Sequence, residues 1–290
     1  MRLLITLSVV ALVTLTSMLV WTSVADHEPV PKRPLVGFKG LRLYELANYR
    51  ELRRLARKQA EVVIVKGDAS ASQVEEARTL DPHIKLVNYE QAFALNKDEA
   101  ELARAKGWLA ATCDGREISP RNVPRATLMD ATIPAAREWR TNLMARETRR
   151  LGYDYNYLDT LRSYFPADFY DGIPCKVSDE AWLKASIDMV KRIRQKTGKA
   201  VIANGRGMQN GLQYVHNREA VDQLVAIADA VQVEHFGRFH SEIGRDVKLV
   251  KAILEAGKEP YVKCRRHGEA CRRILSEIPG TGPIYVSVHR

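Results

Sequence analysis

The chain has 290 residues, of which 46% are hydrophobic and 28% are charged. This length suits one α/β barrel or two smaller domains, and the composition is that of an ordinary globular protein, which excludes a long disordered region. The formal net charge of +10 could favour anionic partners. However, the Lys and Arg residues are scattered over predicted helices and form no motif with aromatic residues, so we expect no nucleic-acid partner.

Residues 1–25 have the pattern of a secretory signal. Arg2 gives a positive start, residues 3–20 carry no charge, and Ser23-Val24-Ala25 offers small residues for cleavage. The apolar run is also long enough to stay as an uncleaved membrane anchor. In either case we expect an exported protein, periplasmic or secreted. Residues 26–34 are then a short linker, and residues 35–290 form one domain, which we expect to be monomeric.

Strands and helices alternate along the predicted domain. The expected strands are residues 35–39, 61–66, 84–90, 153–159, 200–204, 230–234, 260–264 and 283–288. The expected helices are residues 44–59, 71–80, 96–106, 135–151, 178–197, 217–228, 243–256 and 269–278. Two long loops, residues 107–134 and 162–177, interrupt this pattern, and the first could contain two short extended pieces.

Such alternation indicates a parallel sheet, and eight strands indicate an α/β fold of the (β/α)8 TIM-barrel type, here without a helix after the last strand. The alternative is an open, doubly wound sheet. It is disfavoured because no Gly-x-Gly-x-x-Gly follows the first strand and the chain has no phosphate-binding loop.

Polar residues stand at nearly every predicted strand end. They are Lys39, Lys66, Asn88, Glu90, Asp159, Asn204, Arg206, Glu234, His235, Lys263, Arg265 and Ser287. The carboxyl ends of barrel strands meet on one face, where α/β barrels keep their chemistry. Because side chains alternate along a strand, Glu234 shares the inward face of Gln232, and Asp159 shares that of Tyr157. Two inward acids are therefore predicted on this face.

A pair of carboxyl groups is what glycoside hydrolysis requires. We therefore predict Asp159 and Glu234 as catalytic residues. Substrate-binding candidates are Asn88, Tyr157, Asn204, Arg206 and Lys263, since amides and cations can bind hydroxyl groups and tyrosine can stack on a sugar ring. Each has a plain structural alternative. Asp159 could cap the next segment, Tyr157 could be barrel core, Asn204 could belong to a turn, and Lys263 could offset a buried acid.

The four cysteines allow three disulfide pairings. Cys264 and Cys271 are close in sequence, and Cys113–Cys175 would then join the two long loops. The spacings match no common zinc pattern, so we predict neither a metal site nor a cofactor.

Several motifs together resemble a known group of proteins. They are Trp108…Cys113-Asp114-Gly115, Met129-Asp130-Ala131…Arg137-Glu138-Trp139, residues 152–159 (GYDYNYLD), Ile202-Ala203-Asn204-Gly205 and Val233-Glu234. The chain resembles the TIM-barrel proteins grouped as hypothetical glycosyl hydrolase family 15 and, more distantly, glycoside hydrolase family 114, the endo-α-1,4-polygalactosaminidases. This resemblance implies Asp159 and Glu234 as the catalytic pair, with Glu234 as general acid. Three features of this chain depart from the pattern of that family, namely Asn156, Thr160 and the basic net charge.

We therefore expect an exported glycoside hydrolase that acts on a polysaccharide. Two alternatives belong to other classes. One is a non-catalytic glycan- or envelope-binding barrel, which would need no paired acids. The other is a polysaccharide lyase that uses Tyr157 or Lys263 as its base, which unsaturated products would reveal.

Overall fold

A computed structural model describes residues 40–288, apart from residues 59, 122, 124, 266, 267 and 281. The predicted signal segment, the linker and the predicted strand 35–39 lie outside the described residues.

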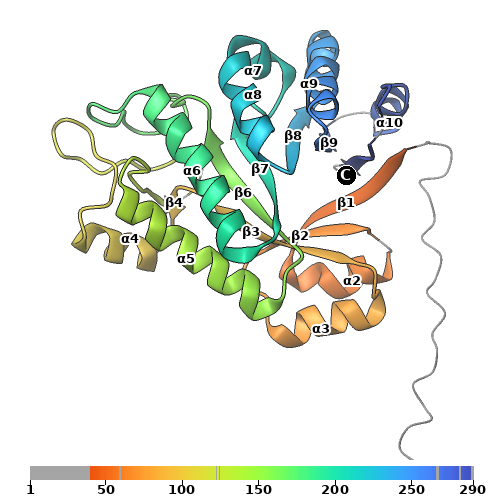
Figure 1. The fold of residues 1–290 in the computed structure, drawn as a ribbon, viewed down its shortest axis with the longest axis horizontal. Coiled ribbons are helices and arrows are strands. Elements are labelled where there is room, and N and C mark those ends of the chain that lie inside the picture. Colours follow the sequence, from red (N-terminus) through yellow and green to blue (C-terminus); the bar gives the residue numbers. More distant parts are fainter. Residues whose placement is uncertain are drawn as a thin grey trace, which may run out of the picture. The chain divides into compact units, whose positions relative to one another are not determined.

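Eight parallel strands close into a barrel, as the sequence predicts (Figure 1). Their order around the barrel is β1-β10-β9-β8-β7-β6-β3-β2. Their bounds are β1 Leu41–Asn48, β2 Val62–Lys66, β3 Lys85–Gln91, β6 Tyr155–Arg162, β7 Ala200–Arg206, β8 Ala230–Phe236, β9 Glu259–Cys264 and β10 Ile284–Val288. The predicted TIM-barrel fold class is confirmed.

Helices surround the strands (Figure 1). They are α2 Leu52–Arg57, α3 Ala71–Leu80, α4 Lys97–Ala105, α5 Pro134–Leu151, α6 Asp179–Thr197, α7 Gly211–His216, α8 Arg218–Ile227, α9 Ile243–Glu255 and α10 Gly268–Ser276. Four of them begin at side chains that cap the first turn: Ser70, Asn96, Ser178 and Asn210. Within the described residues, no helix combines the length and the apolar character needed to cross a membrane.

The first barrel strand differs from the prediction. Residues 44–48 were expected to begin a helix, but they belong to β1, and the helix that follows is only Leu52–Arg57 after a 3₁₀ turn at Tyr49–Glu51. The reason is tertiary. Tyr44 is fully buried inside the barrel, where its hydroxyl accepts a hydrogen bond from Gln232 Nε2 at 2.9 Å. Pairing of β1 with β2 and β10 therefore outweighs the helical spacing of the apolar residues.

The barrel interior is filled by aromatic and branched side chains. Tyr44, Tyr157, Tyr261 and Tyr285 form one buried cluster with Val62, Ile64, Val87, Ile202 and Ala230. The rings of Tyr261 and Tyr285 stack with centroids 4.4 Å apart. A second and larger set of apolar side chains fills the layer between strands and helices. The barrel is thus a packed core, which leaves the strand ends as the place for chemistry.

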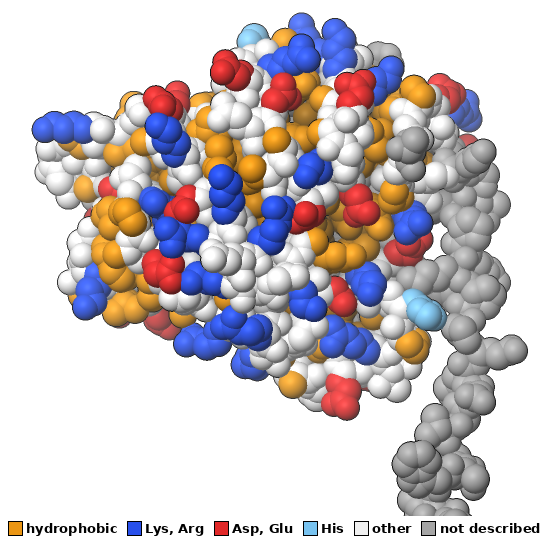
Figure 2. Space-filling model, in the orientation of Figure 1, with side chains coloured by type: hydrophobic (Ala, Val, Ile, Leu, Met, Phe, Trp, Pro, Cys, Tyr) orange, Lys and Arg blue, Asp and Glu red, His pale blue; other side chains and the backbone are white. Residues whose placement is uncertain are grey.

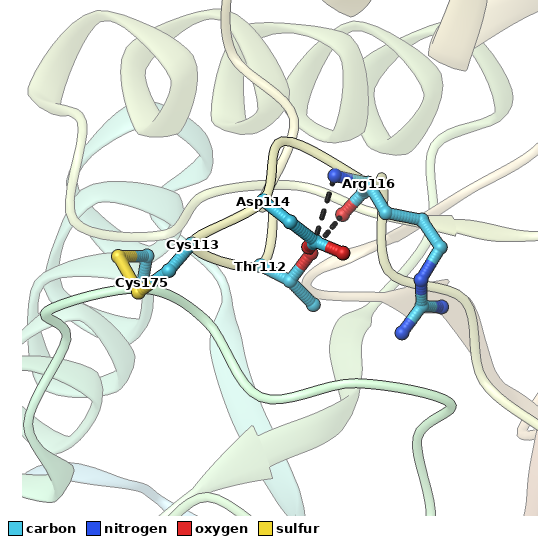
Figure 3. Close-up of a disulfide and its surroundings, with 5 residues drawn as sticks. All are labelled: Thr112, Cys113, Asp114, Arg116 and Cys175. Atoms are coloured by element: carbon cyan, nitrogen blue, oxygen red, sulfur yellow. Dashed lines mark hydrogen bonds between the residues drawn. A yellow bond between two sulfur atoms is a disulfide. The ribbon is translucent and has the colours of Figure 1, made fainter.

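The loop before α5 is tied to two other parts of the chain. Its extended piece β5, Thr127–Leu128, pairs antiparallel with β4, Ala94–Leu95. A disulfide joins Cys113 to Cys175, in the loop before α6 (Figure 3). Beside it, Thr112 Oγ1 accepts from Arg116 N at 3.1 Å and so closes the turn that holds Cys113 (Figure 3). The second disulfide, Cys264–Cys271, is local.

The two disulfides should differ in what they contribute to stability. Their cysteines are 62 and 7 residues apart in sequence. In the chain-entropy account a longer closed loop constrains the unfolded state more. We expect replacement of Cys113 and Cys175 by Ser to lower the free energy of unfolding by about 4 kcal/mol, against about 2 kcal/mol for the corresponding Cys264 and Cys271 variant. Urea denaturation of both double variants measures this, and equal losses would contradict it.

Charged side chains on the visible face are mixed in sign. Lys and Arg are interspersed with Asp and Glu and with apolar side chains and do not gather in one patch (Figure 2). Charged side chains of the described residues also pair locally along helices, as Arg150 does with Glu147 and Lys184 with Glu180. Pairing of this kind is typical of solvated helix faces and contributes little stability.

Candidate active site

Asp159 lies near the carboxyl end of β6, on the inward face that it shares with Tyr157. Its side chain accepts three hydrogen bonds. Tyr89 Oη donates to Oδ2 at 2.5 Å, Asn204 Nδ2 donates to Oδ1 at 3.0 Å, and the backbone N–H of Thr160 donates to Oδ1 at 2.7 Å. The N–H groups of Asn204 and Thr160 can only donate, so the site is built around a carboxylate that accepts.

The backbone just after Asp159 is strained. Thr160 has φ +64°, a left-handed conformation that a β-branched residue rarely adopts. The register of β6 against β7 shifts between Leu158 and Leu161, so Thr160 sits in the irregular part of the strand. This conformation turns the Thr160 N–H back onto the Asp159 carboxylate. Strain of about 1–2 kcal/mol per residue is common at sites where a functional group must be held in one orientation.

Glu234 occupies the corresponding place on β8. Gln209 Nε2 donates to its Oε2 at 3.2 Å. Arg265 Nη2 donates to Oε1 at 3.3 Å, and Lys263 Nζ lies 3.8 Å from the same oxygen. Two cations therefore surround this carboxylate together with two amides, that of Gln209 and that of Asn204.

Asn204, on β7 between the two acids, connects them. Its Nδ2 lies 3.0 Å from Asp159 Oδ1 and 3.5 Å from Glu234 Oε2. The sum of these distances, about 6.5 Å, is the largest separation those two oxygens can have. That limit favours the short spacing of retaining glycosidases, about 5–5.5 Å, over the inverting range of about 6.5–9.5 Å.

The surroundings act on the two carboxyl groups in opposite directions. Burial raises the pKa of Asp159, and the negative charge of Glu234 adds to this, while the Tyr89 hydrogen bond opposes it. Burial alone would also raise the pKa of Glu234, but the charges of Lys263 and Arg265, and that of His235 when it is protonated, lower it below its ordinary value. His235 has its own pKa lowered by burial to about 4. It is therefore neutral at neutral pH, where Lys263 and Arg265 carry the positive charge.

The structure brings Asn204 and Lys263 to the acids, as expected. Arg206 instead extends toward the loop after β6, where it lies 3.8 Å from Asp168 and over the ring of Phe169. It does not contact the two acids.

Two predicted substrate-binding residues lie elsewhere. Tyr157 is 1% exposed, and its hydroxyl donates to Gln232 inside the barrel, so it is core and not a sugar platform. Asn88 points to the outer side of β3, where its Nδ2 donates to Thr148 of α5 at 3.1 Å. Both predictions are wrong in position. Asn88 lies in the middle of β3, on its outward face.

Tyr89 is an inward-facing residue in the second half of β3, and it was not among the predicted site residues. Its ring stacks on Tyr157 with centroids 5.3 Å apart while its hydroxyl reaches Asp159. Strand alternation from Val87, which faces the interior, would have identified Tyr89. No comparable signal existed for Gln209, because it comes from the turn after β7.

Gly205 makes the close approach of β6 and β7 possible. A Cβ atom at this position would lie 1.8 Å from the backbone oxygen of Leu161. We expect Gly205→Ala to lower the free energy of unfolding by about 3 kcal/mol or more, because the clash is with backbone and cannot relax by a rotamer change. Thermal and urea unfolding measure this loss.

Gly244→Ala is the matched control. Gly244 lies in α9, and a Cβ atom added there would meet no other atom within 4 Å, so alanine should stabilise the protein by up to about 1 kcal/mol. A Gly205→Ala protein as stable as the control would disprove the close approach.

A metal centre has no support within the described part of the chain. No group of three or more His, Cys, Asp or Glu residues there is arranged to hold a metal ion. The charges beside the two acids are instead the side-chain cations of Lys263 and Arg265.

Solved structures of other proteins share this architecture, although no family model matches the sequence and no curated protein matches it. The glycoside hydrolase domain of a PelA variant from Pseudomonas aeruginosa aligns with a TM-score of 0.56 at 18% identity, over 85% of this chain and 94% of that one. Ega3 from Aspergillus fumigatus, in complex with galactosamine, aligns with a TM-score of 0.55 at 11% identity, over 87% and 90%.

A third similar structure is the alpha-galactosidase from Lactobacillus brevis, with a TM-score of 0.50 at 10% identity over 87% of this chain and 38% of that one. At such identities the likeness concerns the fold alone. The chain has the TIM-barrel fold found in PelA, Ega3 and other glycoside hydrolases.

Proposed function

We propose that the protein is a glycoside hydrolase that cleaves a polysaccharide with Asp159 and Glu234. The observation that carries the proposal is that one amide nitrogen, Asn204 Nδ2, lies within 3.5 Å of both carboxylates. Two carboxyl groups this close, at the strand ends of a barrel, fit the two-carboxylate mechanism. A protein that only binds glycans would have no need to hold two acids side by side.

Within this proposal Asp159 is the nucleophile. Its oxygens accept hydrogen bonds from Tyr89, Asn204 and Thr160, which hold the carboxylate still, and the bonds from Tyr89 and Thr160 oppose the rise in its pKa that burial causes. Burial strips water from the group, which makes it more reactive once ionised. Glu234 is then the acid and base, as the resemblance implies.

The reaction would follow the retaining course. Glu234 gives its proton to the glycosidic oxygen while Asp159 attacks the anomeric carbon, so the glycosidic bond breaks and a glycosyl ester forms. Glu234, now ionised, takes a proton from water. That water attacks the anomeric carbon, breaks the ester and restores Asp159. No cofactor enters this balance.

We also propose that the protein works outside the cytoplasm. The signal-like residues 1–25 support this, and so do the two disulfides, Cys113–Cys175 and Cys264–Cys271. Disulfides persist in oxidising compartments and are rare in the cytosol.

The test is release of reducing ends from a panel of acidic, neutral and amino polysaccharides, with product analysis by mass spectrometry. Saturated products that carry one added water support hydrolysis. Unsaturated products would mean a lyase instead. Binding without cleavage of any polymer would favour the glycan-binding alternative.

The pH dependence tests the role of Glu234. The pair reacts when it holds one proton, so activity is lost on the alkaline side as that proton leaves. Cations lower the pKa of Glu234, so they shift this loss toward lower pH. Lys263→Met removes one of those cations and should raise the pKa of Glu234. The alkaline limb of kcat/KM should then move to higher pH; a shift to lower pH would contradict the assignment.

A further inference from the structure

A third cation stands near the two acids. Lys66 ends β2 and shares the inward face of Val62 and Ile64. Its Nζ lies 4.6 Å from the centroid of the Tyr89 ring, and the hydroxyl of that ring donates to Asp159. Within the described residues Lys66 forms no hydrogen bond or ion pair; its contact is with the ring face.

The site holds more positive than negative charge. Burial lowers the pKa of Lys263, Glu234 opposes this, and the charges of Arg265 and Lys66 lower it further. These three cations are therefore close enough to repel one another. Lys263 and Arg265 share a single oxygen of Glu234, at 3.8 Å and 3.3 Å, so one acid serves both.

The excess of positive charge is larger in the reactive protonation state of the two acids. When the two acids hold one proton between them, a single negative charge faces three positive ones. Crowding like charges in a half-buried place is costly unless a partner of opposite charge arrives. An amino sugar would add a fourth positive charge, whereas a sugar that carries a carboxylate would reduce the excess.

We propose that the sugar cleaved by this site carries a carboxylate, so that the substrate is an acidic, uronate-type polysaccharide, and that Lys66 binds that carboxylate. This inference rests on the proposed hydrolysis. It sets the chain apart from Ega3, whose structure holds galactosamine, an amino sugar. Lys66 suits the role because its ammonium group has three donors and forms no ion pair within the described residues.

The experiment compares three polymers: polygalacturonate, its neutral methyl ester, and a cationic polygalactosamine. We expect the highest kcat/KM on polygalacturonate, with a fall as salt rises, because salt screens the attraction. Lys66→Met should lower kcat/KM on polygalacturonate by about tenfold or more, mainly through KM. The same substitution should change kcat/KM on the methyl ester little. Lys66→Arg should keep most of the preference.

Lys251→Met is the matched control, because Lys251 is exposed on α9. This substitution should leave kcat/KM on all three polymers unchanged. A Lys66→Met variant that loses activity equally on the acidic and neutral polymers would overturn the inference, since Lys66 would then act on Asp159 and not on the substrate. A sulfated polymer is tested beside these three, and a preference for it over polygalacturonate would overturn the carboxylate assignment.

Binding separates this inference from the proposed function. Calorimetry of an Asp159→Asn protein with oligogalacturonate measures affinity without turnover. Lys66-dependent binding with no cleavage by the native protein supports the acidic ligand and overturns hydrolysis. Asp159-dependent cleavage that prefers the neutral or cationic polymer overturns the acidic ligand and supports hydrolysis.

Discussion

Asp159→Asn is expected to lower the rate of hydrolysis by about 10⁴-fold or more, which is the scale of loss when a residue that acts directly in the chemistry is removed. The amide cannot form the glycosyl ester. The fold should survive, because the new Oδ1 can still accept from Asn204 and Thr160, and the new N–H can donate to the Tyr89 oxygen. Reducing-end assays and thermal unfolding on the same preparation measure both effects.

Asp98→Asn is the control for this substitution. Asp98 is exposed in the first turn of α4, so its loss should leave turnover unchanged and cost less than about 1 kcal/mol of stability. If Asp159→Asn retained native turnover, the catalytic assignment would be abandoned. If it failed to fold, Asp159→Glu, which keeps the charge but moves the oxygens, would still be expected to lose most of its activity.

Glu234→Gln is expected to have the second largest effect. Loss of general acid catalysis should lower kcat by about 10²- to 10⁴-fold on a polysaccharide, whose leaving oxygen needs a proton. In an aryl glycoside made from an acidic phenol, the phenolate leaves without needing that proton. On such a substrate bond cleavage should stay near its native rate, and the slower release of the glycosyl ester should appear as a burst of phenol.

This pair of substrates distinguishes the two roles. Asp159→Asn should be inactive on both, because the nucleophile is needed whatever the leaving group. Glu269→Gln, a change at an exposed residue of α10, serves as the control and should alter neither rate. If Asp159→Asn showed the burst and Glu234→Gln were inactive on both the polysaccharide and the aryl glycoside, the roles of the two acids would be reversed.

Much of this fold could be predicted because its signals are local. Alternation of apolar strands and amphipathic helices indicated the barrel, and the two-residue period of a strand placed Asp159 and Glu234 on the inward face. The same rule, applied to β3, points to Tyr89 and not to Asn88. That error came from choosing the polar residue at a predicted strand end before asking which way it faces.

Contacts between distant segments had no such signal. Residues 44–48 satisfy a helical spacing, yet they form β1 because the closed barrel offers Tyr44 a buried place and a hydrogen bond from Gln232. Gln209 reaches Glu234 from a turn whose path depends on how β7 ends. These conformations depend on burial and strand pairing across the whole barrel. A short stretch of sequence does not specify such long-range contacts.

Seven of the eight barrel strands, the helices between them and two inward acids follow from the sequence because periodicity is a property of neighbouring residues. The groups that surround those acids follow from the tertiary structure. Strand register sets Asn204 between Asp159 and Glu234, brings Lys66 to Tyr89, and lets Lys263 and Arg265 share one carboxylate oxygen. These distances arise when the barrel closes, since closure alone brings together residues that lie far apart in the chain.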